Sequence, residues 1–378
     1  MKSPALRPKS AERPAAAEPW PALRRPALVV PHARPFLGVD EEAAALRVLR
    51  SARLAPGAEA ARFEGLLSRL AGAADAVALN SGTTALTLAL RALGVRDGDG
   101  VVVPSWTCAA LLHAVAGAGG RPIVCDVDPD TLALDPDSLR KGPAAAARAV
   151  VLVHPFGLPI PVEPYRAAGR AVIEDCAQSP GARLQGRPVG SAGDASVFSF
   201  GPTKLLTCGG PGGGLASGDP SIVRTARDLA GHDEKDDAVL RLNGLMGDLH
   251  AAVAAVQVGR LAVVVTRRRA IVERYEEAFQ GLGSRPRLHP TAQPVFHRYL
   301  LGLPGRAGEL IDRLRKAGIQ ARLPVHRPLH RLVGGSAPCP GADEAQGRWV
   351  SLPLSAAFSS AEVDRVIGEV TACLSSRS

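Results

Sequence analysis

Lysine and aromatic residues are scarce in this chain of 378 residues. Only six of its 45 basic residues are lysine, and its aromatic residues are 3 Trp, 3 Tyr and 8 Phe. Alanine, glycine, proline and arginine are abundant, which is typical of a coding bias. Because arginine replaces lysine wherever only a positive charge is needed, a lysine in an apolar, glycine-rich stretch is a candidate for a role that needs a primary amine. Lys204, in FSFGPTKLLTCGGPGGG, is such a lysine.

Long apolar runs and cysteine pairs are also missing. No apolar run reaches the ~18 residues that a membrane span requires, and the N-terminus lacks the apolar core of a secretory signal. The six cysteines contain no CxxC pair, which favours free thiols in a reducing compartment over disulfides or a zinc site. We therefore expect a cytoplasmic protein without a metal centre or membrane contact, and we expect Cys176 in the core. The cysteines are Cys108, Cys125, Cys176, Cys208, Cys339 and Cys373.

The basic charge is concentrated at the N-terminus. The net charge is +9, and residues 1–34 hold seven basic and two acidic residues, which leaves +4 for the rest of the chain. This proline-rich segment is predicted to be a disordered arm. A flexible leader is favoured over nucleic-acid or membrane binding by the arm. Glu12, Glu18 and the prolines argue against an amphipathic transit helix.

From residue 35 onward, helical and strand-like patterns alternate. This order predicts parallel βαβ units and a sheet with helices on both faces. The expected helices are 41–52, 61–72, 84–93 and 107–118, and the expected strands are 75–80, 101–104, 122–127, 149–154, 171–175, 196–200 and 213–217.

The last third of the chain has a different pattern. A long helical region is predicted from about Met246 to Phe279, with Arg267, Arg268 and Arg269 on its solvent side. After a Gly/Pro break we expect a strand and two more helices, which is typical of a smaller α+β domain. The predicted organisation is an arm over 1–34, a large domain over 35–265 and a small domain over 266–378. The late elements are the strand 297–303 and the helices 307–318 and 360–374.

Ligands of open parallel sheets bind at the carboxyl ends of the strands, so residues that follow the predicted strands are candidates for a site. Asn80-Ser81-Gly82-Thr83-Thr84 opens a helix directly after a strand. Its free N–H groups and hydroxyls suit an anion or phosphate, although ordinary capping by Ser81 or Thr83 explains them equally well. No GxGxxG or Walker A motif supports a dinucleotide or P-loop site.

Two further strand ends carry an acid and an amine. Asp175 ends the strand AVIED, where a buried carboxylate needs a partner such as the protonated ring nitrogen of a cofactor or a structural arginine. Lys204 lies among glycines, where burial lowers a lysine pKa and favours a Schiff-base nucleophile over a solvated loop lysine. A phosphate anchor, a carboxylate for a pyridinium nitrogen and an amine together are what pyridoxal phosphate (PLP) requires.

These motifs resemble the DegT/DnrJ/EryC1/StrS family of PLP enzymes from about Phe36 to the end of the chain. The landmarks are LNSGTTALTLALRALGV, VVVPSWTCAALLHAVAGAGGRPIVCDVDPDTLALD, VLVHPFGLP, VIEDCAQSPGARLQGRPVGSAGDASVFSFGPTK, AAVAAVQVGRL and SLPLS. The resemblance implies the aspartate aminotransferase-like fold type I, with a mostly parallel sheet in the large domain. It also implies a homodimer with shared active sites that aminates a nucleotide-linked keto-sugar, with glutamate or glutamine as donor.

The resemblance assigns roles to individual positions. Lys204 matches the Schiff-base lysine, Asp175 the partner of the pyridine nitrogen and Gln178 the residue that faces the cofactor's 3-hydroxyl. Asn243 matches an asparagine that reaches the phosphate across the dimer interface. His154 falls near the substrate in the family, but a strand-end histidine with a backbone partner is an equal alternative. The matched phosphate anchors are Gly82, Thr83, Thr84 and Ser199.

Three positions depart from the family pattern. Cys108 stands where the family has an aromatic residue stacked on the ring. Trp106 is a candidate substitute, although a tryptophan at this position more often packs elsewhere. Pro211 replaces a glutamate, and Leu245 replaces an arginine. A divergent PLP enzyme that acts on a non-sugar carbonyl or an amino acid is therefore an alternative, and a non-catalytic homologue is a second one. The retained Lys204 argues against the latter.

Overall fold

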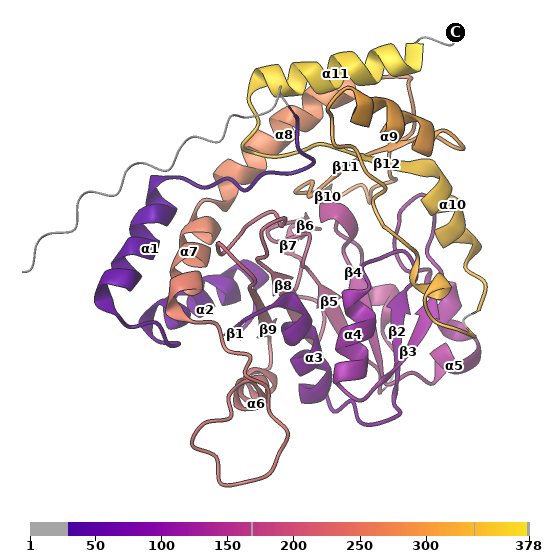
Figure 1. The fold of residues 1–378 in the computed structure, drawn as a ribbon. Helices are drawn as coiled ribbons and strands as arrows, with labels where there is room; N and C mark the ends of the chain where they lie inside the picture. The colour runs from indigo at the N-terminus through magenta and orange to yellow at the C-terminus, as the bar shows by residue number, and fades with distance from the viewer. Residues whose placement is uncertain (1–28, 168, 336, 376–378) are drawn as a thin grey trace, which may run out of the picture.

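The computed structural model describes residues 29–167, 169–335 and 337–375. A seven-stranded sheet lies at the centre with helices on both sides, and a smaller group of helices and short strands lies at one end of it (Figure 1). Most of the predicted arm, residues 1–28, lies outside the described residues.

The central sheet is mostly parallel, as predicted. Its strands follow the order β1-β9-β8-β5-β4-β2-β3. The strand β9 runs antiparallel to both neighbours, and the other four neighbouring pairs are parallel. All seven strands expected for this region are present. They are β1 (Asp75–Leu79), β2 (Gly100–Pro104), β3 (Arg121–Cys125), β4 (Ala149–Val153), β5 (Ala171–Asp175), β8 (Ala195–Ser199) and β9 (Gly213–Ser217).

Side chains alternate along the strands between two apolar layers, as a sheet covered on both faces requires. Val77 and Ile173 pack with α3 (Gly82–Ala92), α4 (Ala110–Gly117) and α6 (Pro220–Ala230). Ala76 packs on the opposite face with α2 (Ala58–Ala71) and α7 (Asp248–Gly259), and α1 (Val39–Ser51) packs outside α7. On β5, Val172 belongs to this opposite side, so Glu174 and Asp175 point to different faces.

The predicted helical region from about Met246 to Phe279 is confirmed and consists of two helices. The helix α7 ends at Gly259, α8 (Leu261–Ala278) follows, and the two are bent by 58°. Glycine is a poor helix former, which fits a break at this point. In the described part of the chain no single helix is long and apolar enough to cross a membrane, and only this bent pair passes by length and composition.

The arginine triplet of α8 is not a uniform solvent-facing surface. Arg268 is buried and donates hydrogen bonds to the carbonyl oxygens of Phe296 (2.8 Å) and His297 (2.6 Å). Arg267 and Arg269 are exposed, as predicted. The correction follows from a tertiary contact, because the backbone carbonyls before β11 (Tyr299–Gly302) need donors and Arg268 supplies them.

The C-terminal elements form a cluster of their own. The antiparallel strands β11 and β12 (Trp349–Leu352) pack with α8, α9 (Ala307–Lys316) and α11 (Ser360–Ser375). The predicted strand and helices of this region are confirmed. The proposed boundary at residue 265 falls within α8, which contributes Val264 to the sheet-side layer and Tyr275 to the C-terminal cluster. The remaining elements are α5 (Gly142–Ala145), α10 (Pro340–Arg348), β6 (Arg183–Leu184), β7 (Arg187–Pro188) and β10 (Ala292–Gln293).

The end of the predicted disordered arm is ordered, which corrects the boundary at residue 34. Val30 is fully buried in the C-terminal cluster, its N–H donates to Gly318, and its carbonyl accepts from Gln320 (both 3.0 Å). His32 is also buried. Val30 is apolar and bridges to a distant segment of the chain. This bridge explains why the end of the arm is ordered, although the composition of the arm predicts disorder.

Candidate active site

Asp175 ends β5 at the carboxyl edge of the sheet. Its side chain is buried, and its Oδ1 accepts a hydrogen bond from the Ala177 N–H (2.9 Å). Burial raises the pKa of Asp175, and the Ala177 N–H and the charges of Lys204 and His154 offset this only in part. A carboxylate in such a place needs a cationic partner to remain ionised.

Lys204 lies in the loop between β8 and β9, where its backbone N–H donates a hydrogen bond to the Gly201 carbonyl (3.0 Å). Burial lowers the pKa of Lys204, while Asp175 and Cys108 oppose this effect and Arg298 adds to it. A lowered pKa increases the neutral fraction of the amine, the form that attacks a carbonyl. Since Lys204 and Asp175 each shift the pKa of the other, the structure brings the predicted amine and acid together.

Glycines bring the start of α3 against the ends of β8 and β9. A Cβ on Gly82 would lie 2.9 Å from the Ser199 Cβ, and a Cβ on Gly213 would lie 2.3 Å from the Ser81 backbone. Glycine is required for both approaches. They place Ser199 beside the first turn of α3, whose leading N–H groups have no partner within the helix and suit an anion.

The same turn also contains ordinary helix capping. The Ser81 hydroxyl accepts a hydrogen bond from the Thr84 N–H (3.0 Å), and the Thr84 hydroxyl donates to the Asn80 side chain (2.7 Å). The two readings of this motif are therefore compatible. Because Thr84 is used for capping, Gly82, Thr83 and Ser199 are the better candidates for a phosphate.

Gln178 and Cys108 approach this edge of the sheet from two other loops. The Gln178 Oε1 accepts a hydrogen bond from the Phe156 N–H (3.1 Å), which orients the side-chain amide and leaves its NH2 group as a donor. Cys108 is exposed, and its charge would raise the pKa values of Lys204 and Arg298. The thiol therefore lies near the amine.

Trp106 does not replace the missing aromatic residue. Its side chain is 2% exposed and packs edge-to-face on Phe156, with 5.5 Å between ring centroids. Its indole N–H donates to Gln346 of α10 (2.8 Å). The contact joins the sheet edge to the C-terminal elements, so the assignment of Trp106 to the cofactor was wrong, since a buried indole N–H needs the partner that α10 provides.

His154 is not available to a substrate either. It is 1% exposed, its Nδ1 accepts from the Ile160 N–H (3.0 Å), and its Nε2 lies 2.9 Å from Glu174. The strand-end histidine with a backbone partner is the correct alternative. The Glu174 carboxylate also accepts hydrogen bonds from the backbone N–H groups of Gly190, Ala192 and Gly193, at 2.6–2.8 Å. We call His154, Glu174 and these N–H groups the Glu174 cluster.

Asn243 lies beside the predicted phosphate site only through its backbone. Its backbone carbonyl accepts a hydrogen bond from the Asn80 side-chain amide (2.9 Å), and the Gly244 carbonyl accepts one from the Asn80 N–H. Leu245 then forms an antiparallel β-bridge with Leu79. The side chain of Asn243 is exposed. Leu245 thus has a structural place in this bridge.

Sequence reasoning missed Arg298, which immediately precedes β11. Its charge contributes to the lowered pKa of Lys204, so it lies near the amine. The pattern HRYLLGL indicated only a strand. An arginine at a strand start is common, and its electrostatic effect on Lys204 acts between segments that are distant in sequence.

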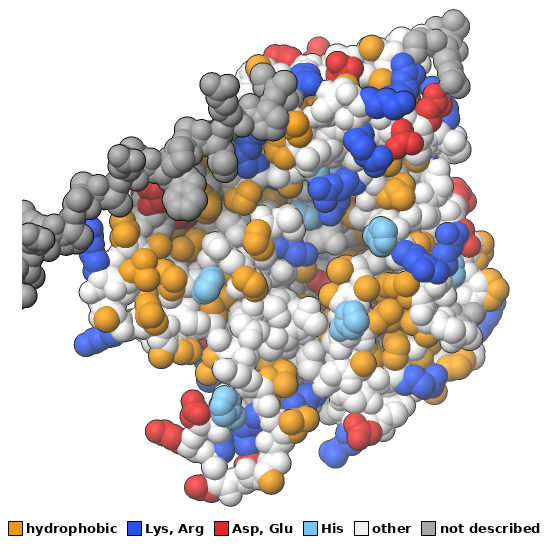
Figure 2. All heavy atoms as spheres, viewed as in Figure 1, with side chains coloured by type: hydrophobic (Ala, Val, Ile, Leu, Met, Phe, Trp, Pro, Cys, Tyr) orange, Lys and Arg blue, Asp and Glu red, His pale blue; other side chains and the backbone are white. Residues whose placement is uncertain are grey.

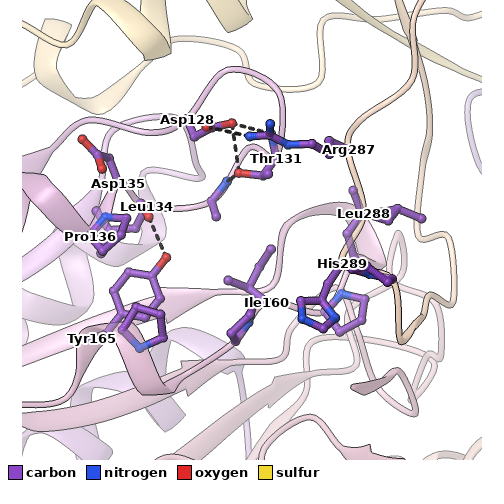
Figure 3. Close-up of a pocket in the computed structure, with 16 residues that line it drawn as sticks. Asp128, Thr131, Leu134, Asp135, Pro136, Ile160, Tyr165, Arg287, Leu288 and His289 are labelled. Atoms are coloured by element: carbon purple, nitrogen blue, oxygen red, sulfur yellow. Dashed lines mark hydrogen bonds and ion pairs between the residues drawn. The ribbon is translucent and has the colours of Figure 1, made fainter. Parts of the chain in front are cut away.

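A separate cavity of about 410 Å³ contains none of the predicted site residues in its lining (Figure 3). Side chains of the loops around Asp128, Leu134 and Ile160 face Leu288 and His289 across it. Its lining is mainly apolar, whereas the predicted chemistry is concentrated around Lys204.

The geometry around Lys204 fits PLP on three observations. The close approach of α3 to Ser199, which glycines allow, forms an anion site. Asp175 is a buried acid whose partners offset the effect of burial on its pKa only in part, and Lys204 is an amine of lowered pKa. With the mostly parallel sheet, these features define a PLP-dependent enzyme of fold type I.

Comparison with known proteins identifies the family. The model of the DegT/DnrJ/EryC1/StrS aminotransferase family matches residues 36–371, and the chain belongs to this family. It is therefore an aminotransferase, and PLP is its cofactor.

Several relatives cover nearly the whole chain. A dTDP-3-amino-3,4,6-trideoxy-alpha-D-glucose transaminase of Streptomyces venezuelae is 32% identical over 88% of this chain and 92% of its own length. The crystal structure of S. venezuelae DesV with a ketimine intermediate has a TM-score of 0.83 and 32% identity, over 89% of this chain and 94% of that one. The aminotransferase TlmJ of Streptoalloteichus hindustanus has a TM-score of 0.84 and 31% identity, over 91% and 98%.

Proposed function

We propose that this protein transfers an amino group to the keto group of a nucleotide-linked sugar, with glutamate or glutamine as donor. The observation that carries the proposal is the Asp175–Lys204 pair beside the anion site of Gly82 and Ser199. The similarity to a transaminase named for a dTDP-linked amino sugar supports the substrate class.

Each residue contributes a separate task. Lys204 holds the cofactor through its amine and moves the proton of the substrate carbon, and Asp175 supplies the charge opposite the ring nitrogen. The α3 N-terminus and Ser199 bind the phosphate, and the Gln178 amide donates to the ring hydroxyl. PLP itself supplies an electron sink for the carbon that exchanges its amino group.

A homodimer in which Asn243 completes the phosphate site of the partner subunit is part of this proposal. The exposed side chain of Asn243 and the exposed apolar residues of the N-terminal helix and its following loop support it. Hydrophobic side chains gather over α1 in Figure 2. The apolar residues are Val39, Leu46, Leu49 and Leu54. Sedimentation analysis tests the dimer, and a monomer with full activity would contradict it.

We also propose a cytoplasmic location and the division into a large domain to residue 265 and a small domain after it. The free state of all six cysteines supports a reducing compartment. The two apolar clusters joined by α8 support the division. Fractionation of cells that express the full chain tests the location, and limited proteolysis tests the division.

The function is tested with Lys204→Ala and a screen of acceptors. Wild-type protein reconstituted with PLP should show the visible absorbance of the lysine-bound cofactor, lose it on addition of glutamate or glutamine, and aminate a nucleotide-linked keto-sugar. Lys204→Ala should abolish the absorbance and reduce turnover at least ~10²–10⁴-fold. Lys141→Ala is the matched control. Turnover of 2-oxo acids but of no keto-sugar would favour a divergent PLP enzyme. The reason to consider this alternative is that Cys108 stands where the family has an aromatic residue.

A further inference from the structure

A second apolar cavity, of about 320 Å³, lies between the C-terminal half of α8, the strand β11 and the segment that precedes β10. Its volume falls within the ~300–1,000 Å³ that is usual for small-molecule sites. None of the residues predicted for the active site belongs to its lining. We call it the Tyr299 cavity, and its apolar side chains are Leu158, Val272, Pro286, Leu288, Phe296 and Leu300.

Tyr299 contributes a buried hydroxyl without a partner to this cavity. Its side chain is 2% exposed, and the part of the chain that the structure describes offers this hydroxyl no hydrogen bond. The ring is held by an edge-to-face contact with Tyr275 (5.0 Å between centroids) and by the Arg285 guanidinium, 5.3 Å from its centroid. Burial raises the pKa of Tyr299, so the hydroxyl keeps its proton. A buried hydroxyl without a partner is costly, and a ligand oxygen would remove this cost.

The charged groups that act on this hydroxyl, Arg285 and Glu276, already have partners within the chain. The Arg285 Nε donates to both carboxylate oxygens of Glu276 (2.8 and 3.0 Å). Its other nitrogens donate to the carbonyls of Phe279, Gly283 and Ser284 at 3.2–3.3 Å. This pair is neutral as a whole, so it does not require a charged ligand.

The Tyr299 cavity adjoins the cavity of about 410 Å³ described above, because Leu158 and Leu288 line both. Figure 3 shows Leu288 and His289 on the side of the larger cavity that lies opposite Tyr165. Leu158 is buried, whereas Leu288 is 39% exposed. A ligand therefore reaches the Tyr299 cavity past the side chain of Leu288.

We propose that the Tyr299 cavity binds a compact neutral ring compound that carries a hydroxyl group, such as a phenol or a cyclic alcohol. Burial of the ring among the apolar side chains is favourable. The Tyr299 hydroxyl both donates and accepts, so it pairs with a ligand hydroxyl in either direction. The proposal does not depend on the proposed function, because the cavity contains no residue used there.

Arg298 raises one alternative, a ring compound with a negative charge. It lines the Tyr299 cavity and also a cavity of about 630 Å³ on the side of α9. Its guanidinium lies 3.5 Å from the His32 Nε2, and His32 lines neither cavity. This contact directs the charge away from the Tyr299 hydroxyl. A neutral ligand is therefore the better match, and an anion is an outcome that the experiment distinguishes.

The experiment titrates the PLP-loaded protein into 4-fluorophenol and follows the fluorine NMR signal. 4-Fluorotoluene has nearly the same size and a methyl group in place of the hydroxyl, and 4-fluorobenzoate carries a negative charge. Wild type should bind 4-fluorophenol saturably and 4-fluorobenzoate more weakly, since a charged group loses its hydration in an apolar cavity. Lys204→Ala should bind 4-fluorophenol as wild type does.

Tyr299→Phe removes only the hydroxyl. It should weaken 4-fluorophenol ~3–10-fold, the size of one neutral hydrogen bond, and leave 4-fluorotoluene within ~2-fold. The matched control Tyr165→Phe removes a buried hydroxyl that already donates to the Leu134 carbonyl (2.6 Å), and both probes should stay within ~2-fold. Leu288→Trp should block both probes. Its control is Leu332→Trp, at a leucine of similar exposure outside the cavity.

Urea denaturation provides a readout without any ligand. The midpoint of Tyr299→Phe should be unchanged or higher, because the variant removes a hydroxyl that lacks a partner, whereas the midpoint of Tyr165→Phe should fall. An equal fall in the two variants would show that the Tyr299 hydroxyl has a partner, which would contradict the proposal.

Absence of saturable 4-fluorophenol binding to folded wild type would overturn the proposal, as would equal effects of Tyr299→Phe on the two neutral probes. Tighter binding of 4-fluorobenzoate that is lost in Arg298→Gln would also overturn it and assign an anion to the cavity. Weaker 4-fluorophenol binding in Lys204→Ala would place the probe in the active site instead. If Tyr299→Phe does not fold, Leu288→Trp decides, since unchanged binding in that variant contradicts the proposal.

Discussion

The consecutive acids Glu174 and Asp175 lie in two opposite environments at the end of β5. Glu174 is fully supplied with partners, His154 and three backbone N–H groups. Burial alone would raise its pKa, but the hydrogen bonds from His154 and from the backbone N–H groups lower it to about 2. Asp175 points to the other face, and burial raises its pKa because its partners offset the cost only in part.

The difference separates a structural cluster from a binding site. In the Glu174 cluster the chain itself provides the hydrogen-bond donors that the carboxylate needs, so nothing further is required. Burial also lowers the pKa values of the Lys204 amine and the Arg298 guanidinium, and nearby negative groups offset this effect only in part. Charges of this kind are costly unless a ligand completes them, and perturbed groups are common at functional sites for this reason.

The largest effect on stability is expected for Glu174→Gln. Glutamine keeps one oxygen as an acceptor but turns an NH2 group towards donors that the other carboxylate oxygen accepts from, which should reduce the free energy of unfolding by about 3–5 kcal/mol. Urea denaturation measures this loss. The control Asp364→Asn removes the exposed partner of Arg274 and should cost less than about 1 kcal/mol. Equal losses in the two variants would show that the cluster is not structural.

Asp175→Asn should have the reverse profile. Removal of the charge opposite the ring nitrogen should reduce turnover ~10²-fold, equivalent to about 3 kcal/mol. The PLP-free protein should be as stable as wild type or more so, since an acid with a raised pKa destabilises the fold at neutral pH. Stopped-flow turnover and urea denaturation of the PLP-free form measure the two effects. A large loss of stability with normal turnover would reverse our assignment of the two acids.

Acid should weaken the surroundings of His32 and the Glu174 cluster over different pH ranges. The pKa of His32 is 6.5 in an unfolded chain and about 3 in the fold, so below pH 6.5 only the unfolded chain gains this proton. Stability should therefore fall by about 1.4 kcal/mol per pH unit between pH 6.5 and 3. The contribution of Glu174 is complete above its usual pKa of 4.5 and is lost only as the pH falls towards 2.

Urea denaturation at pH 7 and pH 5.5 tests the upper range with His32→Gln. The variant should lose part of the pH dependence of wild type, because glutamine does not titrate. Glu174→Gln should keep that dependence. If wild type and His32→Gln respond equally to pH, His32 does not contribute as described.

The smallest effect is expected for Cys108→Tyr. The exposed thiol lies near Lys204, at the position where the family has a stacked aromatic residue. An added ring contact should tighten PLP binding by about 0.5–1.5 kcal/mol. Equilibrium dialysis measures the affinity, and Cys108→Ser is the control that removes the thiol without adding a ring. Weaker PLP binding in the tyrosine variant alone would argue against this placement of Cys108.

Local patterns in the sequence predicted most of the fold. Alternating apolar runs and helical periodicity predicted the central strands and their helices, because both depend on residues close in sequence. The helical region after Met246 was predicted without its break at Gly259, since a single glycine within an apolar pattern is compatible with a continuous helix. The burial of Arg268 depends on carbonyls of a distant segment.

The candidate site was predicted less completely. Lys204, Asp175, Gln178, Ser199 and the start of α3 share an edge of the sheet, which follows from strand order. The sequence left two alternatives open for Trp106 and for His154, because the indole partner lies on α10 and the carboxylate partner on the neighbouring strand. Arg298 was missed because nothing in its local sequence indicates that its charge acts on Lys204.

The most direct measurement is the site of covalent PLP attachment. The PLP-loaded protein is reduced with borohydride and digested, and the modified peptide is identified by mass spectrometry. We predict a pyridoxyl group on Lys204, none on the other five lysines, and none on any lysine of Lys204→Ala. Attachment to another lysine, or no attachment in protein that is folded and exposed to PLP, would contradict the assignment of Lys204 and Asp175 as the centre of the site.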